Sequence, residues 1–351
     1  ILVNKEGILK TIDLGKTEII DKLINDALIS TENIYPDSQD LWDKVGEKFI
    51  NPLKPFFKNY QNIYITPDGE LNNIPINVIR DRKSKEYLAG KFNIRLLTSG
   101  RDLIDIFQKQ ESSNNKPIIV GDPDFNISSE LKYKNNQKRS FDLKNKIWTE
   151  LPGTKIESEK IAKLTNGTLL TREDANTLEI QKRISPKIIH VASHAYYLEN
   201  IQKSLLDDEK SFIPESPLIR SGIVLAGANN NVENINQDDG YLTSLEITNL
   251  NWQDTELVVI SACSSAKGKI KTGEGVYGLK RAVAVAGANS TLLSLWDVDD
   301  KATANFMENF YIKLKNNVSR SQALYQTQEE FRQHPIKRWR HPNVWAAFQL
   351  S

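Results

Sequence analysis

The amino-acid sequence predicts an α/β protein built around a mostly parallel sheet. Short apolar runs recur along the chain with little alternation of apolar and polar residues, and amphipathic stretches stand between them. Runs without this alternation are typical of strands covered on both faces. Strands that alternate with helices predict a parallel sheet with helices on both sides. The predicted strands are 62–66, 117–120, 187–192, 256–262 and 290–296.

Four stretches between or after these strands predict helices. The first follows a turn of Pro152, Gly153 and Thr154; Thr154 suits the cap position, and Glu157 stands three residues later, the spacing of a capping box. The other stretches look helical in their pattern of apolar residues. The predicted helices are 155–164, 275–286, 299–314 and 319–331.

A long polar stretch, 126–146, is rich in Asn, Lys and Ser and predicts a loop or linker. It divides the chain near residue 148 into an N-terminal unit, 1–148, and a C-terminal unit, 149–351. The single Cys and all four His lie in the second unit, so thiol or imidazole chemistry is predicted there. Further polar stretches at 199–215 and 227–239 predict loops at the carboxyl ends of parallel strands, where α/β proteins build their sites.

Composition argues against several classes of function. The 351 residues carry 46 Lys and Arg against 45 Asp and Glu, a net charge of +1, whereas neutralising the phosphates of nucleic acid needs a clear basic excess. No apolar run reaches the ~18 residues of a membrane-spanning helix. A single Cys excludes an internal disulfide and favours a reducing, cytoplasmic location. The features of a signal peptide are missing. The chain begins at Ile1 instead of an initiator Met, so we expect a piece of a longer protein.

Two strand ends carry side chains that can act together. The strand predicted at 187–192 releases His194 into a turn of small residues, and the strand at 256–262 delivers Cys263 at its carboxyl end, which lies at the same edge of a parallel sheet. A thiolate is a nucleophile, and an imidazole both favours the thiolate and protonates the leaving amine. The alternative for Cys263 is a small buried apolar residue. Its flanks argue against that alternative: Ser261, Ser264, Ser265 and Gly268.

The other histidines predict no second site. His190 precedes His194 by four residues on the same strand, and we expect a core histidine or one that supports the site. These two histidines could form a metal pair, but the HExxH pattern is missing and no third ligand is in view, so neither metal nor cofactor is predicted. His334 and His341 each precede a proline, and we expect structural roles for both.

Residues 273–278 have the GxGxxG pattern of dinucleotide-binding proteins. In that class the pattern follows a buried strand and opens a βαβ unit, but here it follows the polar residues 266–272. A flexible loop that enters a helix is the better interpretation. A nucleotide-binding module remains as an alternative, and it requires a strand that ends just before Gly273.

Ordered motifs over nearly all of the chain resemble one family. Residues 63–80 (IYITPDGELNNIPINVIR), 120–125 (VGDPDF) and 151–159 (LPGTKIESE) are followed by HVASHAYYL around His194, ISACSSAKG around Cys263 and the closing HPNVWAAFQL. Each block is moderately specific, and the ordered set is highly specific. Together they resemble the CHAT domain family, caspase-like domains often joined to tetratricopeptide repeats, and more distantly separase.

The resemblance implies a caspase-hemoglobinase fold, an α/β/α sandwich in which an inactive N-terminal caspase-like unit braces an active C-terminal one. It implies peptide-bond hydrolysis by a His/Cys dyad, with His194 as base and Cys263 as nucleophile. Backbone N–H groups of Ala195 and Cys263 would form the oxyanion hole. Ala195 stands where the family usually has Gly, so the mechanism requires a negative φ there, because only Gly reaches positive φ at little cost.

Substrate preference is a hypothesis that comes from the resemblance to separase, which cleaves after Arg. Residues 296–300 (WDVDD) resemble the WDVTD of separase. A carboxylate at the bottom of a pocket selects Arg or Lys through a charge-assisted pair, so we expect Asp297 or Asp299 to line the S1 pocket and to favour a basic P1 residue. The alternative is that these acids cap the helix predicted at 299–314.

Two functions from different classes therefore remain. The first is a cysteine endopeptidase that acts on a protein substrate and is regulated by a sensor or repeat module outside this chain, with no direct nucleic-acid or membrane partner. The second is a catalytically silent scaffold of the same fold that binds a partner protein. A silent relative usually loses the dyad, and both His194 and Cys263 are present, which favours the endopeptidase.

Overall fold

The computed structural model describes the chain except for residues 5, 8, 58, 108–111, 128–142, 144–145, 199–215, 217, 231–237 and 265–271. At residues 105, 263–264 and 272–277 it describes the backbone alone. The loops predicted at 199–215 and in most of 126–146 therefore lie outside the described residues.

One sheet of eight strands forms the centre of the C-terminal half. Its strands are β5 (Ile118–Pro123), β6 (Thr168–Arg172), β7 (Ile188–Tyr197), β8 (Ser221–Val224), β9 (Tyr241–Thr243), β10 (Leu257–Ser264), β11 (Thr291–Ser294) and β12 (Phe348–Leu350). The order is β12-β11-β10-β7-β5-β6, and β8 joins β7 to β9. The pairs within β6-β5-β7-β10-β11 are parallel, whereas β12 and β8 run antiparallel to their neighbours. The predicted mostly parallel α/β fold is confirmed.

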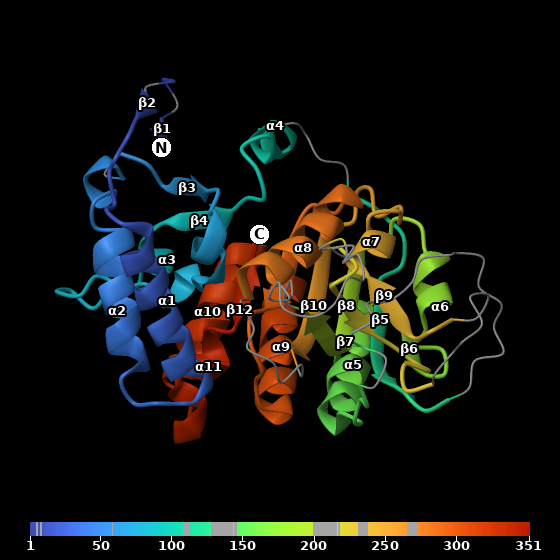
Figure 1. Cartoon of the computed structure of the whole chain (residues 1–351). Coiled ribbons are helices and arrows are strands. Elements are labelled where there is room, and N and C mark those ends of the chain that lie inside the picture. Colours follow the sequence, from blue (N-terminus) through green and yellow to red (C-terminus); the bar gives the residue numbers. More distant parts are fainter. Residues whose placement is uncertain are drawn as a thin grey trace, which may run out of the picture.

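Helices cover both faces of this sheet. In Figure 1, α7 (Ser244–Ile247) and α8 (Thr272–Val285) lie above the strands, and α5 (Pro152–Thr165) and α9 (Asp300–Lys315) lie below them, packed against each other. A further helix, α10 (Arg320–Arg332), packs on α9. The result is the α/β/α sandwich expected from the sequence, because each face of the parallel strands is apolar and must be buried.

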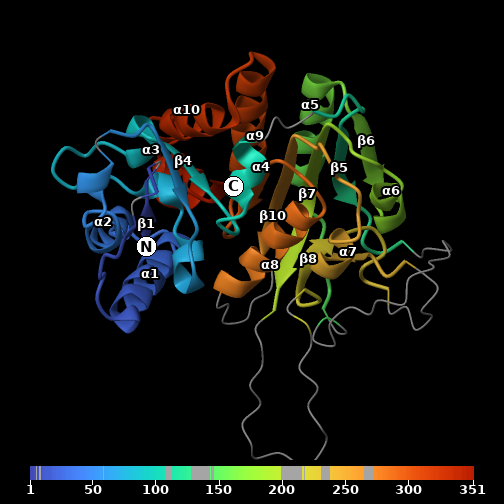
Figure 2. The same ribbon diagram turned by 90° about the horizontal axis from the view of Figure 1, so that it is seen from above.

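The N-terminal half lies beside the sheet, as Figure 2 shows from above. Its helices α1 (Thr17–Glu32) and α2 (Ser38–Phe49) pack together, and the indole of the fully buried Trp42 donates to Thr31 Oγ1 at 2.8 Å. The strand predicted at 62–66 exists as β3 (Asn62–Ile65), but it pairs with β4 (Asn93–Leu96) in a separate two-stranded parallel sheet. The predicted strand is confirmed, and it lies outside the main sheet.

Shorter elements complete the chain. They are β1 (Leu2–Val3), β2 (Leu9–Lys10), α3 (Leu88–Lys91), α4 (Asp102–Phe107), α6 (Thr177–Gln181), α11 (Pro342–Trp345) and 3₁₀ turns at Lys54–Phe56, Gly69–Asn73, Ile76–Val78 and Lys337–Arg340.

The larger of two hydrophobic clusters runs through both halves, from residues of α1 and α2 to residues of β12. Polar contacts cross the same boundary: Gln349 Nε2 donates to the Ile74 carbonyl at 2.8 Å, and Asn77 Nδ2 donates to Gln328 Oε1 at 2.9 Å. The last elements of the chain thus hold the N-terminal half in place. The division near residue 148 stays a prediction.

The start of α5 differs from the predicted capping box. The helix begins at Pro152, a residue suited to the first helical position because its missing N–H would have no partner there. Thr154 lies inside the first turn, where its hydroxyl donates to the Leu151 carbonyl at 2.7 Å. Gly153 allows close packing on α9, since a Cβ there would lie 2.4 Å from Cβ of Asp300.

The GxGxxG stretch was predicted as a loop that enters a helix at Gly275, and the helix begins three residues earlier than predicted. Residues 273–278 all lie within α8, which begins at Thr272. The dinucleotide-binding pattern needs its first glycine in a tight turn between a strand and a helix, whereas Gly273 already lies inside the helix.

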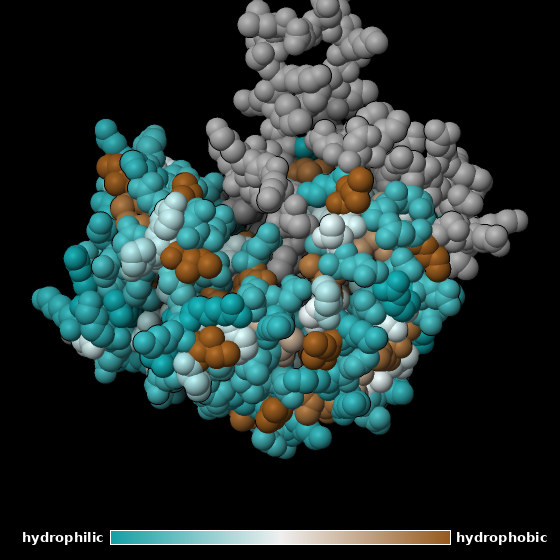
Figure 3. Space-filling model, turned by 90° about the horizontal axis from the view of Figure 1, so that it is seen from below, coloured by the Kyte–Doolittle hydropathy of each residue, from teal (hydrophilic) through white to brown (hydrophobic). Residues whose placement is uncertain are grey.

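Within the described part of the chain, none of the helices has the length and apolar character needed to cross a bilayer. Figure 3 shows the face of the molecule seen from below, where hydrophilic side chains cover most of the described surface and apolar ones are scattered. Scattered exposed apolar residues are ordinary on a folded protein and need no partner to explain them.

Candidate active site

The strands β7 and β10 are parallel neighbours, and their register pairs Cys263 with His194. The pairing continues by one residue, to Ser264 and Ala195, so both positions belong to one unbroken ladder. Paired residues of neighbouring strands occupy the same face of a sheet. The structure thus brings together the two positions that the sequence singled out; the Cys263 side chain itself lies outside the described atoms.

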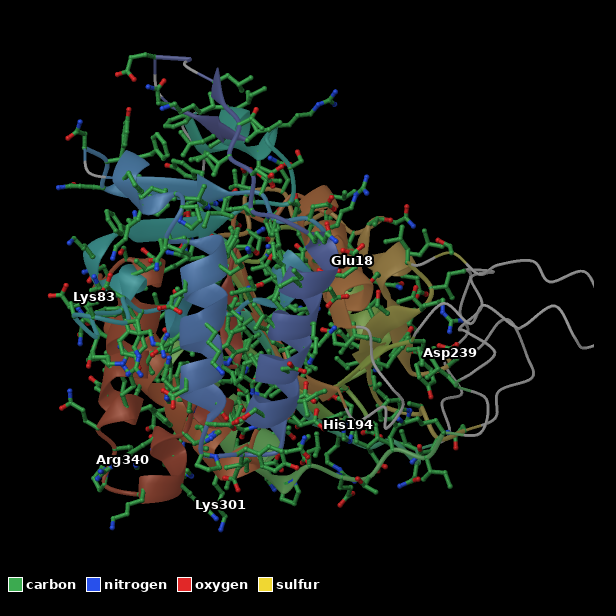
Figure 4. The ribbon with its side chains drawn as sticks, turned by 60° about the vertical axis from the view of Figure 1, so that its left-hand side comes forward. Glu18, Lys83, His194, Asp239, Lys301 and Arg340 are labelled. Carbon is green, nitrogen blue, oxygen red and sulfur yellow. The ribbon has the colours of Figure 1, made fainter. Side chains whose placement is uncertain are left out.

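His194 lies among the packed side chains of the C-terminal half (Figure 4) and is only 3% exposed. Its ring lies between two aromatic rings, with centroid distances of 5.4 Å to Phe125 and 5.1 Å to Trp148. Its Nε2 lies 2.8 Å from the Thr149 carbonyl oxygen. A carbonyl only accepts, so Nε2 carries the proton and Nδ1 is the basic nitrogen of the neutral ring.

Burial lowers the pKa of His194 below its ordinary value, because it disfavours the charged imidazolium. The Thr149 carbonyl opposes this shift, and the positive charge of Lys146 adds to it. The imidazole is therefore neutral at neutral pH. A neutral imidazole is the form that can accept a proton from a thiol.

Residues 146–150, here called the 146–150 segment, cover the imidazole. Trp148 is buried, its backbone N–H donates to Asn229 Oδ1 at 2.7 Å, and Asn229 Nδ2 donates to the Trp148 carbonyl at 2.9 Å. The Trp148 indole also donates to the hydroxyl of Tyr241 at 2.8 Å. This segment was not predicted, although the apolar pair Ile147 and Trp148, directly after a polar stretch, was a usable signal.

Ala195 is not in the turn that the sequence predicted after His194. The strand β7 continues to Tyr197. Its pairing with β5 stops at Ala192, and β8 pairs with its last four residues. Ala195 is fully buried and does not have a positive φ, so an alanine fits there without backbone strain. Its role in an oxyanion hole stays a prediction.

Asp297 lies within electrostatic reach of the 146–150 segment. Its side chain is exposed at the surface, but the surrounding protein displaces water from it, and this desolvation raises its pKa to about 6, while Lys146 opposes the shift. The Lys146 ammonium in turn lies 4.7 Å from the ring centroid of Trp148. The charge of Lys146 thus acts on Asp297, and Lys146 packs on Trp148, which contacts His194.

A second carboxylate from the N-terminal half shares this region. Burial raises the pKa of Glu32, at the end of α1, and the negative charge of Asp297 adds to the shift. Two like charges that influence each other lie close in space. Glu32 was not predicted, because nothing in a pattern of residues places α1 beside the end of β11.

Asp299 occupies the cap of α9. Its Oδ1 accepts from the Ala302 backbone N–H at 3.0 Å, and its Oδ2 lies 3.8 Å from Arg338 Nη2. This is the capping role weighed against a role in the S1 pocket. Asp300 begins the helix, and burial raises its pKa. Of the two acids expected to line the S1 pocket, Asp299 caps a helix and Asp297 does not. Asp297 is therefore the S1 candidate of the two.

His190 lies on the same face of β7 and is fully buried. Its Nε2 is 3.0 Å from Glu157 Oε1 on α5, and its Nδ1 is 3.2 Å from the hydroxyl of Tyr311 on α9. The histidine thus joins the two helices to the strand that carries His194. This is the core or supporting role that the sequence predicted.

The remaining histidines have structural contacts, as predicted. His341 caps α11, accepting at Nδ1 from the Asn343 N–H at 3.1 Å, and its Nε2 lies 2.9 Å from the Tyr35 carbonyl. His334 accepts at Nδ1 from the Ile336 N–H, also at 3.1 Å, and its ring packs on Trp339. Among the described residues, no cluster of three His, Cys, Asp or Glu suited to a metal ion is found.

An α/β sandwich that pairs a buried histidine with a cysteine on adjacent parallel strands is the architecture of a caspase-like domain. The chain belongs to the CHAT domain family, whose model matches residues 39–351. The membership expected from the ordered motifs is confirmed.

Curated relatives include tetratricopeptide repeat protein 28 of Homo sapiens, 24% identical over 312 residues, and its Mus musculus counterpart, 23% identical over 320 residues. Each alignment covers 83% of this chain and 12% of the relative, so the chain spans about an eighth of the relatives' length. Among solved structures, the Arg-specific cysteine proteinase gingipain R aligns with 95% of this chain and 72% of its own, at 10% identity and a TM-score of 0.40.

Proposed function

We propose that the chain is a cysteine endopeptidase in which Cys263 is the nucleophile and His194 is the general base. The observation that carries the proposal is the register of β7 and β10, which pairs these two residues. The neutral state of His194 and membership of the CHAT family support it. An uncharged imidazole next to a thiol is the starting state of this chemistry.

The reaction follows from these two groups. The Cys263 thiol gives its proton to His194, and the thiolate forms a bond to the scissile carbonyl carbon. Backbone N–H groups, for which Ala195 and Cys263 are the candidates, stabilise the resulting oxyanion. The imidazolium then returns the proton to the amine nitrogen as the carbon–nitrogen bond breaks. Water, deprotonated by His194, hydrolyses the thioester and restores the thiol.

Labelling of the thiol tests the dyad, and the sequence makes this test clean because Cys263 is the only cysteine. A peptidyl acyloxymethyl ketone should label the wild type, should not label Cys263→Ala, and should label His194→Ala much more slowly. Iodoacetamide, which needs only an accessible thiol, reports accessibility in the same samples. Equal labelling of His194→Ala and of the matched control His334→Ala by the ketone would overturn the role of His194.

Two parts of the 146–150 segment act differently on His194: the Thr149 carbonyl holds the tautomer in which Nδ1 is the base, whereas the Trp148 ring covers the imidazole. We therefore expect Trp148→Ala to raise the rate of labelling by the ketone several-fold. Trp148→Phe is the matched control, because it keeps a ring against His194 and loses only the indole hydrogen bond to Tyr241. If Trp148→Ala slows labelling while its circular dichroism is unchanged, the segment supports the site rather than covers it.

We propose that Asp297 favours a basic P1 residue. The ratio of kcat/KM for an Arg-P1 substrate to that for a Leu-P1 substrate should then fall as the pH is lowered through about 6, where Asp297 becomes neutral. The titration of the dyad changes kcat/KM for both substrates equally, so it cancels in the ratio. Asp297→Asn should give a low ratio that does not change with pH.

Asp299→Asn is the control, because asparagine caps a helix as well as aspartate does. It should keep the wild-type ratio and its pH dependence.

The thermal stability of the protein offers a second readout. Since the folded-state pKa of Asp297 is raised, its stabilising contribution is present at low pH and is lost as the pH rises through about 6. Asp297→Asn should therefore raise the melting temperature at neutral pH. A pH-independent wild-type ratio would rule out Asp297 as the S1 acid.

Regulation by a repeat module is proposed from the relatives, whose name states that they contain tetratricopeptide repeats. The 146–150 segment, which covers the imidazole, is an element that such a module can control. The competing proposal is a scaffold that binds a partner protein without cleaving it. The two differ in one result: a scaffold keeps its full effect after Cys263→Ala, whereas an endopeptidase loses it.

A further inference from the structure

A cavity of about 710 Å³ lies at the edge of the sheet opposite to His194. It opens where β7 and β10 begin, at Ile188 and Leu257, and its other wall comes from β3 and β4, through Tyr64 and Arg95. His194 lies six residues further along β7, about 20 Å away at 3.3 Å per residue. The cavity is therefore separate from the candidate active site, and it joins the two halves of the chain.

Positive side chains dominate the lining. Four cationic side chains line the cavity, Lys187, Arg95, Lys315 and Arg320, against one side-chain carboxylate, Glu256. Glu256 lies 3.6 Å from Lys187, so that pair is compensated. Among the described residues, neither arginine forms an ion pair with a carboxylate. The side chains that line the cavity thus carry an excess of positive charge.

Both guanidinium groups are held in place by backbone carbonyls. Arg95 Nη2 donates to the Asn289 carbonyl at 2.7 Å, and Arg320 Nη1 donates to the Glu256 carbonyl at 2.8 Å. A guanidinium has five N–H donors, so each arginine keeps donors for a further acceptor. Burial lowers the pKa of Arg320, Glu256 opposes the shift, and the charge of Arg95 adds to it. The two arginines are close enough to repel each other.

The helix α10 adds donors to the same cavity. Its cap residue Ser319 and its first residues Arg320 and Ser321 line the wall, and the Ser319 side chain makes no capping hydrogen bond. The helix has 13 residues, so its first turn presents unpaired N–H groups and a partial positive charge. Beside the two arginines, these groups favour a ligand with more than one negative charge over a single carboxylate.

We propose that this cavity binds a small molecule with phosphate groups, held between Arg95 and Arg320. Guanidinium groups recognise phosphate oxygens by paired hydrogen bonds. The volume fits a ligand of nucleotide size, since small-molecule pockets span about 300–1,000 Å³. Because the walls come from β3–β4 and from the C-terminal half, a bound phosphate would hold the two halves together. The proposal does not depend on the proposed peptidase activity.

Inorganic phosphate, pyrophosphate, ATP and adenosine are the probes, used with the whole chain in thermal unfolding and titration calorimetry. Pyrophosphate and ATP should raise the melting temperature saturably and adenosine should not, because a ligand that binds only the folded state stabilises it. Arg95→Gln and Arg320→Gln should each weaken binding about tenfold or more, as expected for loss of a charge-assisted hydrogen bond.

Arg281→Gln, at an exposed position of α8, is the matched control and should bind like the wild type. Phosphate also stabilises proteins without binding, by exclusion from their surface, and that effect would be equal in all variants. Equal stabilisation of the four proteins, or no saturable response to any phosphate probe, would overturn the proposal. Using two arginine variants keeps the test decisive if one of them fails to fold, which circular dichroism reports.

Discussion

Replacing Cys263 by alanine is expected to reduce peptide hydrolysis by at least about a thousandfold, because the variant lacks the atom that forms the acyl intermediate. His194→Ala should cost about 10²- to 10⁴-fold, the range for loss of a general base. The measurement is kcat/KM on a fluorogenic peptide at a pH above the lowered pKa of His194, where the wild-type imidazole is neutral.

Ser261→Ala is the matched control for Cys263→Ala. Ser261 lies two residues earlier on β10, on the same face, and its buried hydroxyl has no hydrogen-bond partner among the described atoms. This variant should keep activity and stability. Activity that survives Cys263→Ala at the wild-type level would reject the dyad. An inactive wild type whose partner binding survives the substitution would support the scaffold.

The parallel strands were predictable because their residues are uniformly apolar. The runs at 187–192 and 256–262 became the buried centres of β7 and β10, with Ile189, Val258 and Val259 fully buried. Strands covered on both faces need such residues, whatever packs on them. The pairing of His194 with Cys263 follows from that pattern, since both residues lie at fixed offsets from their apolar runs.

The end of β7 was not predictable, because it depends on a distant partner. The small residues around His194 suit a turn as well as a strand, and the strand forms because β8 pairs with residues 194–197. The same limit explains β3: its apolar pattern predicts a strand, but the pattern does not say that its neighbour is β4. Local propensity identifies a strand; its partner is decided by tertiary packing.

The surroundings of the site were the least predictable part. Thr149, Trp148 and Glu32 meet His194 or Asp297 from segments with no chemical motif of their own. The motif residues carry reactive groups and could be recognised by type. The residues that set the pKa of those groups act by covering them or by their charge, and only the folded arrangement reveals which segments do so.

Phe306→Ala is expected to lower the free energy of unfolding by about 3–5 kcal/mol, the cost of removing a phenylalanine from a packed core. The Phe306 side chain on α9 is fully buried; its ring is stacked on Phe348 of β12 at 4.6 Å and meets Phe331 of α10 edge-on at 5.1 Å. One ring therefore joins a strand of the main sheet to two helices. Urea unfolding followed by tryptophan fluorescence measures the change.

Ile312→Ala on the same helix is the matched control, since Ile312 is 39% exposed. It should change the unfolding free energy by no more than about 0.5 kcal/mol, as is usual for surface substitutions. The helix α9 also carries Tyr311, which contacts His190 behind the site. If Phe306→Ala destabilises the fold as expected but leaves ketone labelling of the folded protein unchanged, the aromatic cluster acts on stability alone. Equal urea midpoints for the two variants would show that α9 is not anchored through Phe306.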